Sequence, residues 1–307
     1  MVVANGDPNL YFNRDTRVYL EADGLIWEIP VLNGYSFSQA TNTSEITLNE
    51  ASNATGVSRR GRAMFNDSLA PAEWSFDTYV RPYLAGTAHA AIEEVLWAMF
   101  VAKVTDIAAG VNPAPETYTP AGTITRVGTT NMDVGFANSN ALTLGEFDLV
   151  FVLGGSRQPD ANYEADGETT IYRLNRCSVN EVGITFDLDG IATLSWSGMG
   201  SRVKEEIPAY NASTAIRRAV DSTNTFIRNK LTAVTLVNND GAKAYDIVLT
   251  GGSITMTNNL TYLTPEVLGR VNTPLGHTTG PRSISGSLTA YLDNKTNGTM
   301  DLFEDLS

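Results

Sequence analysis

The carboxylates best placed for chemistry lie in the segment Asp187-Leu188-Asp189-Gly190. Acidic residues and a glycine in a short loop are typical of cation sites, and carboxylates two residues apart on a strand point to the same side, as a paired acid and base would need. The EF-hand spacing is absent, because no third ligand precedes the glycine and no glutamate closes the loop. No His, Ser or Lys partner of the usual kind lies nearby in the sequence. We therefore predict a turn between two strands here, and no catalytic, cofactor-binding or metal site.

A second cluster is basic and consists of Arg59, Arg60 and Arg62, in a polar segment expected to be a loop over residues 49–61. The cluster stands out because the chain carries a net charge of −13. A solvated loop tip explains it, and so does an arm that docks on an acidic partner surface. The residues themselves leave both interpretations open.

The overall composition excludes several classes of protein. A net charge of −13 argues against nonspecific nucleic-acid binding, which needs a basic surface. The single cysteine, Cys177, excludes an internal disulfide framework and favours a reducing compartment, where it is expected to be a small buried apolar residue. The N-terminus lacks the features of a signal peptide, and the most apolar run, residues 95–104, is about half a membrane span and contains Lys103. The sequence predicts a soluble protein made in a cytoplasm.

Strands should dominate the elements that position these residues. The segment from Trp74 to Val80 alternates in side-chain type, which predicts a half-buried strand that ends before Pro82. Turns are expected before it, at residues 66–68 and 70–71. Asp-Gly at residues 23–24 and Asn-Asn-Asp-Gly at 238–241 predict hairpins. Apolar residues spaced from Ile92 to Phe100 predict a helix over residues 86–105, with Glu93 and Glu94 facing away from the core.

The chain divides into four parts. Residues 1–15 are a polar N-terminal arm, residues 16–205 a first domain, residues 206–224 a charged linker and residues 225–307 a second domain. The second domain repeats the order of elements of the first. A strand, an Asp-Gly turn and a strand come first, then a stretch rich in Thr and Asn, and then S-F-D-T-Y-V (residues 75–80) or S-L-T-A-Y-L (residues 287–292). This shared order over about 75 residues indicates a duplicated domain.

The second copy looks incomplete. After its strand repeat it reaches only what we expect to be the first turn of a helix, F-E-D-L at residues 303–306, which mirrors I-E-E-V at residues 92–95. Without the later strands the sheet would keep an open edge. Either the chain is a fragment of a longer product or another subunit supplies the edge, and we favour the fragment.

Several stretches resemble the tail tube (major tail) proteins of long-tailed bacteriophages, in the branch with two fused tube domains. They are R-G-R-A-M-F-N-D-S-L-A-P-A-E-W-S-F-D-T-Y-V-R-P-Y at residue 60 onward, I-R-N-K-L-T at 227, N-N-L-T-Y-L-T-P at 258 and G-S-L-T-A-Y-L at 286. The resemblance covers most of residues 16–306 and departs from the family at the C-terminus.

The resemblance implies a mainly β fold: duplicated tube-type β-sandwich domains, each with a flanking helix, whose sheets join between subunits into a lumen-lining barrel. It also implies a structural virion protein without cofactors. Three chains would form a pseudo-hexameric ring, and rings would stack into a tail tube for DNA ejection. The expected partners are further copies of the chain, the tape measure, and tail terminator or tip proteins. DNA would pass without specific binding, no membrane would be involved, and assembly would occur in the bacterial host cytoplasm.

On this view we hypothesise that Arg59, Arg60 and Arg62 contact an acidic face of the adjacent ring. One rival is a carbohydrate-binding or adhesive module that uses Trp27, Tyr35 and Trp196 as exposed platforms. Those residues occupy positions typical of a core, and such a module does not explain the repeat. The other rival is a hydrolase that uses Asp187 and Asp189. Self-assembly without a ligand distinguishes the tube protein from both.

Overall fold

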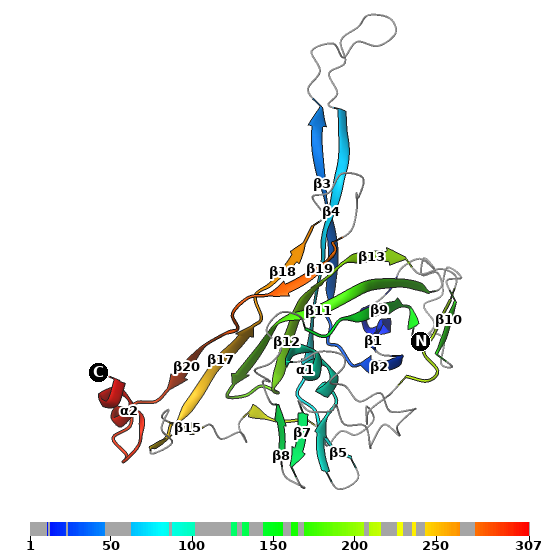
Figure 1. Cartoon of the computed structure of the whole chain (residues 1–307). Coiled ribbons are helices and arrows are strands. Elements are labelled where there is room, and N and C mark those ends of the chain that lie inside the picture. The colour runs from blue at the N-terminus through cyan, green and yellow to red at the C-terminus, as the bar shows by residue number, and fades with distance from the viewer. Residues whose placement is uncertain are drawn as a thin grey trace, which may run out of the picture.

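The structure is a computed structural model of the chain. It describes residues 11, 13–22, 24–46, 63–85, 88–101, 124–127, 131–134, 144–155, 161–164, 169–205, 209–215, 226–229, 235–237, 243–264 and 274–306. Strands dominate, as expected (Figure 1). The strands before residue 206 are β1 (Arg17–Ala22), β2 (Leu25–Ile29), β3 (Ser36–Ile46), β4 (Ala63–Tyr79), β5 (Pro82–Ala85), β6 (Ala88–Ala91), β7 (Ile124–Val127), β8 (Asn131–Val134), β9 (Phe147–Leu153), β10 (Asn162–Glu164), β11 (Thr170–Asp187), β12 (Thr193–Gly200) and β13 (Arg202–Glu205).

The later strands are β14 (Ala209–Asn211), β15 (Thr235–Val237), β16 (Ala244–Asp246), β17 (Leu249–Thr257), β18 (Leu260–Leu263), β19 (Gly276–Thr279) and β20 (Ser283–Ala290). Two α-helices, α1 (Glu94–Val101) and α2 (Thr299–Leu306), and a short 3₁₀ helix, Asn13–Asp15, complete the described elements. None of the described helices is long and apolar enough to cross a membrane.

The main sheet has ten strands, and the long strand β11 joins its parts. The N-terminal part of β11 pairs with β9 and β13, and its C-terminal part pairs with β12 on one edge and β17 on the other. The path through the sheet runs β2-β1-β9-β11-β12-β4-β3, and both of its ends are open, so this sheet of the described chain does not close into a barrel. Figure 1 shows β3 and β4 projecting as one long hairpin, while β17 and β20 lead away to the C-terminus.

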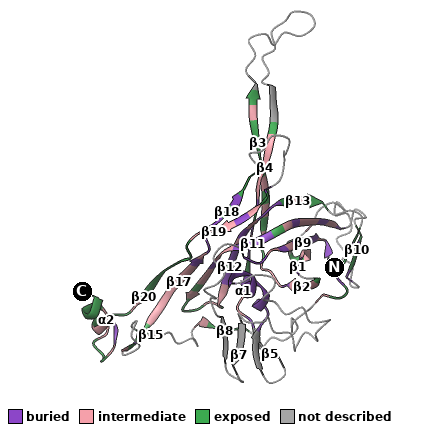
Figure 2. Ribbon diagram, in the orientation of Figure 1, coloured by how far each residue is buried: buried purple, intermediate pink, exposed green. Residues whose placement is uncertain are grey.

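The core lies where the two parts of this sheet face each other. Trp74 of β4 meets Phe147 of β9 edge-on, with ring centroids 5.9 Å apart, and Trp97 of α1 meets Trp196 of β12 at 5.1 Å. All four side chains are buried, and α1 is buried along its whole length (Figure 2). Burial of large aromatic side chains of this kind is a major source of stability in a β-sandwich.

The helix prediction needs two corrections. Residues 88–91 form strand β6, which pairs with β5, and the helix begins only at Glu94. Four residues rich in alanine favour a helix, but the backbone pairing with β5 overrides that local preference. Glu93 and Glu94 do not face solvent, because α1 is enclosed on all sides and both glutamates are buried.

The turns predicted at residues 66–68 and 70–71 are also wrong, since β4 runs through both of them as it pairs with β3. The register shifts between Gln39 and Thr41, so that Ala70 and Pro71 lie in a bulge. A bulge tolerates a proline within a strand, because the missing N–H is not needed for the ladder. The predicted end of the strand before Pro82 is confirmed, and β4 stops at Tyr79.

Two predicted hairpins are confirmed. β1 pairs with β2 through Ala22 and Leu25, and Gly24 has a φ of +77°, a conformation that glycine adopts without strain. β15 pairs with β16 through Val237 and Ala244. The segment predicted as a linker contains β14, which pairs with β10, and its Tyr210 is buried beside Tyr19 and Tyr163.

The C-terminal helix is longer than the expected single turn. α2 spans eight residues and begins at Thr299, four residues before Phe303. The Thr299 N–H donates to the Asp293 carboxylate, at 2.9 Å, and this bond satisfies one donor of the first turn.

Candidate functional site

Six strands form a continuous antiparallel layer in the order β20-β17-β11-β12-β4-β3. Side chains alternate between its two faces, and directly paired residues share a face. One face carries apolar residues. Those of β4, β11 and β12 face the core, and those of β17 and β20 lie on the same face of the layer. The apolar residues of this face are Phe37, Trp74, Phe76, Leu194, Trp196, Val182, Ile184, Ile254, Met256, Ile284 and Leu288.

The opposite face is lined by short hydroxyl side chains, and we call it the hydroxyl face. Its residues are Ser36, Ser38, Ser75, Thr193, Ser195, Ser197, Thr185, Ser253, Thr255, Thr257, Ser283, Ser285, Ser287 and Thr289. The same face holds the carboxylates of Glu73, Asp77, Glu181 and Asp187. Tyr79, Met199, Gly183 and Gly251 also lie on it, and none of these paired positions holds Lys or Arg. The face therefore offers hydrogen-bonding groups and negative charge, but no cation for a phosphate.

In this layer the strands before residue 206 meet the strands after residue 248 at one seam, where β17 pairs with β11. Seven consecutive residue pairs join the strands, from Glu181–Thr257 to Asp187–Gly251. The seam is therefore a backbone ladder, and side chains around it add further contacts between β11 and the strands after residue 248.

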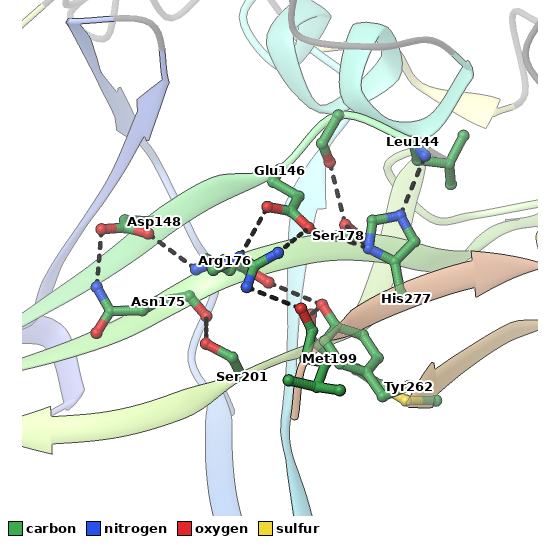
Figure 3. A network of polar contacts seen from close by, with 12 residues as sticks. Leu144, Glu146, Asp148, Asn175, Arg176, Ser178, Met199, Ser201, Tyr262 and His277 are labelled. Carbon is green, nitrogen blue, oxygen red and sulfur yellow. Dashed lines mark hydrogen bonds and ion pairs between the residues drawn. The ribbon is translucent and has the colours of Figure 1, made fainter. Parts of the chain in front are cut away.

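A polar cluster secures one end of this seam (Figure 3). Arg176 of β11 makes two bonds to Glu146, from Nε to Oε2 at 2.9 Å and from Nη2 to Oε1 at 3.1 Å. Its Nη1 also donates to the Leu275 carbonyl, at 3.1 Å, on the segment that enters β19. The bidentate bond to Glu146 and the bond to Leu275 together fix the guanidinium between β9 and β19.

His277 of β19 belongs to the same cluster and is buried. The backbone N–H of Leu144 donates to its Nε2, at 3.1 Å, so this nitrogen carries a lone pair. Nδ1 faces Ser178 Oγ at 3.4 Å and Glu146 Oε1 at 3.5 Å. Hydrogen bonding from His277 and then from Arg176 lowers the pKa of Glu146 to about 2, against the opposing effect of its partial burial.

Asn258 and Tyr262, near the end of β17, bond to the strands and the helix before residue 206. Asn258 Nδ2 donates to the Phe100 carbonyl at 2.9 Å, and its Oδ1 accepts from Arg282 Nε at 2.9 Å. The Tyr262 hydroxyl lies 2.7 Å from the Arg176 carbonyl oxygen and 3.0 Å from that of Met199. Buried polar groups of this kind stabilise one arrangement strongly, because losing a partner leaves the other group unsatisfied.

The residues singled out from the sequence are spread over the molecule. Arg59, Arg60 and Arg62 lie outside the described residues, between the end of β3 and the start of β4. Asp187 ends β11 and accepts a hydrogen bond from the Gly190 N–H, which confirms the predicted turn. No group of three His, Cys, Asp or Glu residues suited to a metal ion occurs among the described residues.

Cys177 is buried, as predicted, and burial raises the pKa of its thiol well above the usual value. The aromatic platforms of the adhesive alternative do not form. Trp27 and Trp196 are buried, and Tyr35 stacks on Phe151 with centroids 5.5 Å apart.

Sequence reasoning missed the seam cluster, including Glu146, Arg176, Asn258, Tyr262 and His277. One clue was present, since His277 is one of only two histidines in the chain. Its partners lie more than 90 residues away, so no local pattern could reveal them.

Comparisons with known proteins agree with the resemblance. Residues 71–306 match the family model of the phage tail tube protein. The chain is 33% identical over 285 residues to the tail tube protein pb6 of Escherichia phage T5. The match covers 91% of this chain but 55% of the relative, so the chain spans little more than half the relative's length.

Two solved structures share a distant likeness. One is the sheath/tube terminator of the extracellular contractile injection system PVC in its extended state. It has a TM-score of 0.34 and 12% identity, and the match covers 67% of this chain and 99% of that one. The other is the sheath–tube complex of the same system, with a TM-score of 0.33, 12% identity and coverage of 67% and 93%. At these TM-scores the likeness carries no argument about this chain.

Proposed function

Because the chain belongs to the phage tail tube protein family, we propose that it is a structural subunit that assembles into stacked rings, and that these rings form the tube through which a phage genome leaves the capsid. The observation that supports this most is the hydroxyl face, a continuous polar surface that spans both repeats. In a ring, this face lines the channel, and the apolar face packs against the covering layer.

Three chains form each ring in this proposal. Two repeats per chain then give six similar units, and the β11–β17 seam supplies the join between two units inside one chain. A strand ladder of the same kind would join the units of neighbouring chains, since both β3 and β20 have an edge without a strand partner in the described sheet. Residues 16–205 and 225–307 are the two units, with 1–15 as an arm and 206–224 as the connection.

The chemistry of the hydroxyl face suits the passage of DNA. Tight binding of DNA to protein depends on Lys and Arg that neutralise phosphates and release counterions. A surface of hydroxyls and a few carboxylates offers no such neutralisation, and the net charge of −13 adds general repulsion. DNA therefore slides through without a specific site.

The subunit is a virion component assembled in the bacterial host cytoplasm, and it performs no catalysis. Its partners are further copies of itself, the tape measure inside the tube, and terminator or tip proteins at its ends. Arg59, Arg60 and Arg62 contact an acidic face of the adjacent ring.

Negative-stain electron microscopy of the purified protein at rising concentration tests the proposal. We expect rings or hollow tubes whose end views show pseudo-sixfold symmetry. A protein that stays as single particles at every concentration, both alone and when a longer form of the chain is examined, would contradict it.

A further inference from the structure

One hollow on the hydroxyl face lies beside Asn180 of β11, and we call it the Asn180 pocket. Its volume is about 260 Å³. Polar side chains of β3, β4, β11 and β12 line it, namely Ser36, Ser38, Glu73, Ser75, Asn180 and Ser197. Met199 lines it too, and among the described residues no lysine or arginine does. The pocket therefore offers hydroxyl groups, an amide, one carboxylate and the flexible apolar side chain of Met199.

A bulge in β11 accounts for the position of this pocket. The pairing of β11 with β12 shifts between Val179 and Glu181, which makes Asn180 the extra residue of the bulge. Two hydrogen bonds hold Asn180 toward the connection between β17 and β18. Its Oδ1 accepts from the Leu260 N–H at 2.8 Å, and its carbonyl oxygen accepts from the Asn258 N–H at 2.8 Å. The bulge interrupts the even row of side chains on the hydroxyl face, and the pocket lies beside it.

The charge of the lining favours a cation. Glu73 is exposed and makes no hydrogen bond or ion pair with another described residue. Ser36 and Ser75 share a hydrogen bond of 2.8 Å, and each serine hydroxyl keeps lone pairs that can accept from a further donor. An anionic ligand would meet the carboxylate of Glu73 without a lysine or arginine to balance it.

An alkylammonium suits this lining better than a metal ion. Mg²⁺ and Ca²⁺ sites usually combine several oxygen ligands with more than one carboxylate. No group of three His, Cys, Asp or Glu residues suited to a metal ion occurs in the part of the chain that the structure describes. An ammonium group has three N–H donors, which Glu73 and the serine hydroxyls can accept. The partly exposed side chain of Met199 provides an apolar surface for the methylene groups beside the ammonium.

A second carboxylate lies across the layer from Glu73. Glu181 of β11 pairs with Ser197 of β12, and Ser197 pairs in turn with Ser75 of β4. Glu73 and Glu181 are thus separated by two strand spacings, about 10 Å. Glu181 Oε2 accepts from Thr257 Oγ1 at 3.2 Å, and a carboxylate has capacity for further donors. Two ammonium groups joined by an alkyl chain can therefore each reach a carboxylate.

We propose that the Asn180 pocket binds a linear polyamine, with one ammonium group held by Glu73 and the serine hydroxyls and the next ammonium group held by Glu181. The alkyl chain between them crosses β12 beside Met199. The pocket forms within one chain, so this proposal does not rest on tube assembly. In the proposed ring, occupied pockets would lower the negative charge of the channel wall.

Saturation-transfer NMR with spermidine tests the proposal on the full chain, at a dilution where the chain is monomeric. Glu73→Gln should raise the Kd for spermidine by about fivefold or more, because the ammonium loses its charged acceptor. Asp77→Asn is the matched control. It removes the same charge from the same strand and the same face, outside the pocket, and should change the Kd by less than about twofold.

Butylamine, which has a single ammonium group, tests the role of Glu181. Glu181→Gln should weaken the binding of spermidine and leave the weaker binding of butylamine unchanged. No binding of spermidine, or an equal loss in the Glu73→Gln and Asp77→Asn chains, would overturn the proposal, because net charge alone would then attract the cation. Displacement of spermidine by Mg²⁺ at the same concentration would overturn it too. Since the chain is monomeric in these experiments, none of these results bears on ring formation.

Discussion

At the residue scale, the seam depends on buried side chains that each have several partners. His277 accepts from the Leu144 N–H and faces both Ser178 and Glu146, while Arg176 bridges Glu146 and the Leu275 carbonyl. The contacts of His277 with Leu144 and Ser178, and of Arg176 with Leu275, join segments that lie about 100 residues apart or more. Single substitutions in this cluster should therefore weaken the packing of β19 against β11 rather than the pairing of one strand.

His277→Ala should lower the free energy of unfolding by about 2–4 kcal/mol, because the buried Leu144 N–H loses its acceptor and a cavity forms. Urea denaturation followed by circular dichroism measures the loss. Arg14→Ala is the control, since the Arg14 side chain is 77% exposed and its ion pair with Asp15 is a surface contact of small energy. Equal midpoints for His277→Ala and the wild type would contradict this role.

Glu93 makes the stability of the fold decrease as the pH rises from about 4.5 to about 8. Burial raises the pKa of Glu93 from 4.5 to about 8, so the folded state holds a proton that the unfolded state releases. The stabilisation that protonated Glu93 gives is complete below pH about 4.5 and is lost progressively as the pH rises through about 8.

Glu93→Gln should remove this contribution and make stability between pH 5 and pH 9 flatter by about 2 kcal/mol or more. Thermal unfolding at pH 5, 7 and 9 provides the comparison. Glu73→Gln, which changes an exposed glutamate on β4, should keep the wild-type slope. A Glu93→Gln profile as steep as that of the wild type would count against the buried, protonated carboxyl.

At the element scale, the alternation of β4, β11, β12, β17 and β20 produces the two contrasting faces. Sequence patterns predicted the alternation of residues 74–80 in β4 and the hairpin turns, because each depends on residues close together in the chain. They did not predict strand β6, the long course of β4 or the burial of Glu93. In each case backbone pairing or packing in the folded chain overrides the local preference, as the pairing of β6 with β5 and the bulge at Pro71 show.

The hydroxyl face should begin to bind DNA if a lysine side chain is introduced into it. In assembled tubes, Ser195→Lys should retain short duplex DNA in a sedimentation assay, and retention should fall steeply between 50 mM and 200 mM salt. Wild-type tubes and Ser195→Asn tubes should retain none. DNA retention by wild-type tubes equal to that by the lysine variant would contradict the assignment of this face to the channel.

The segment between β3 and β4 should act in stacking. Changing Arg59, Arg60 and Arg62 together to Glu should abolish polymerisation, because three attractive charges toward an acidic surface become repulsive. Tube length by electron microscopy is the readout, and the triple change to Lys should preserve tubes. Unchanged tube length in the glutamate variant would remove these arginines from the contact.

At the scale of the whole molecule, the hairpins β3–β4 and β17–β20 lie in one layer of the sheet, with β12 and β11 between them. The sequence predicted the mainly β class and the tail tube family, because strand patterns and family motifs consist of consecutive residues. It did not predict the seam, because Glu146, Arg176, Asn258 and His277 come from separate segments of the sequence and meet only in the folded chain.

A cryo-electron microscopy reconstruction of assembled tubes tests the central claim most directly, because it shows which face of the six-stranded layer surrounds the channel. The account predicts that Ser195, Ser253 and Ser287 point into the channel and that three chains complete each ring. A reconstruction with these serines on the outer surface of the tube, or with the apolar face toward the channel, would contradict it.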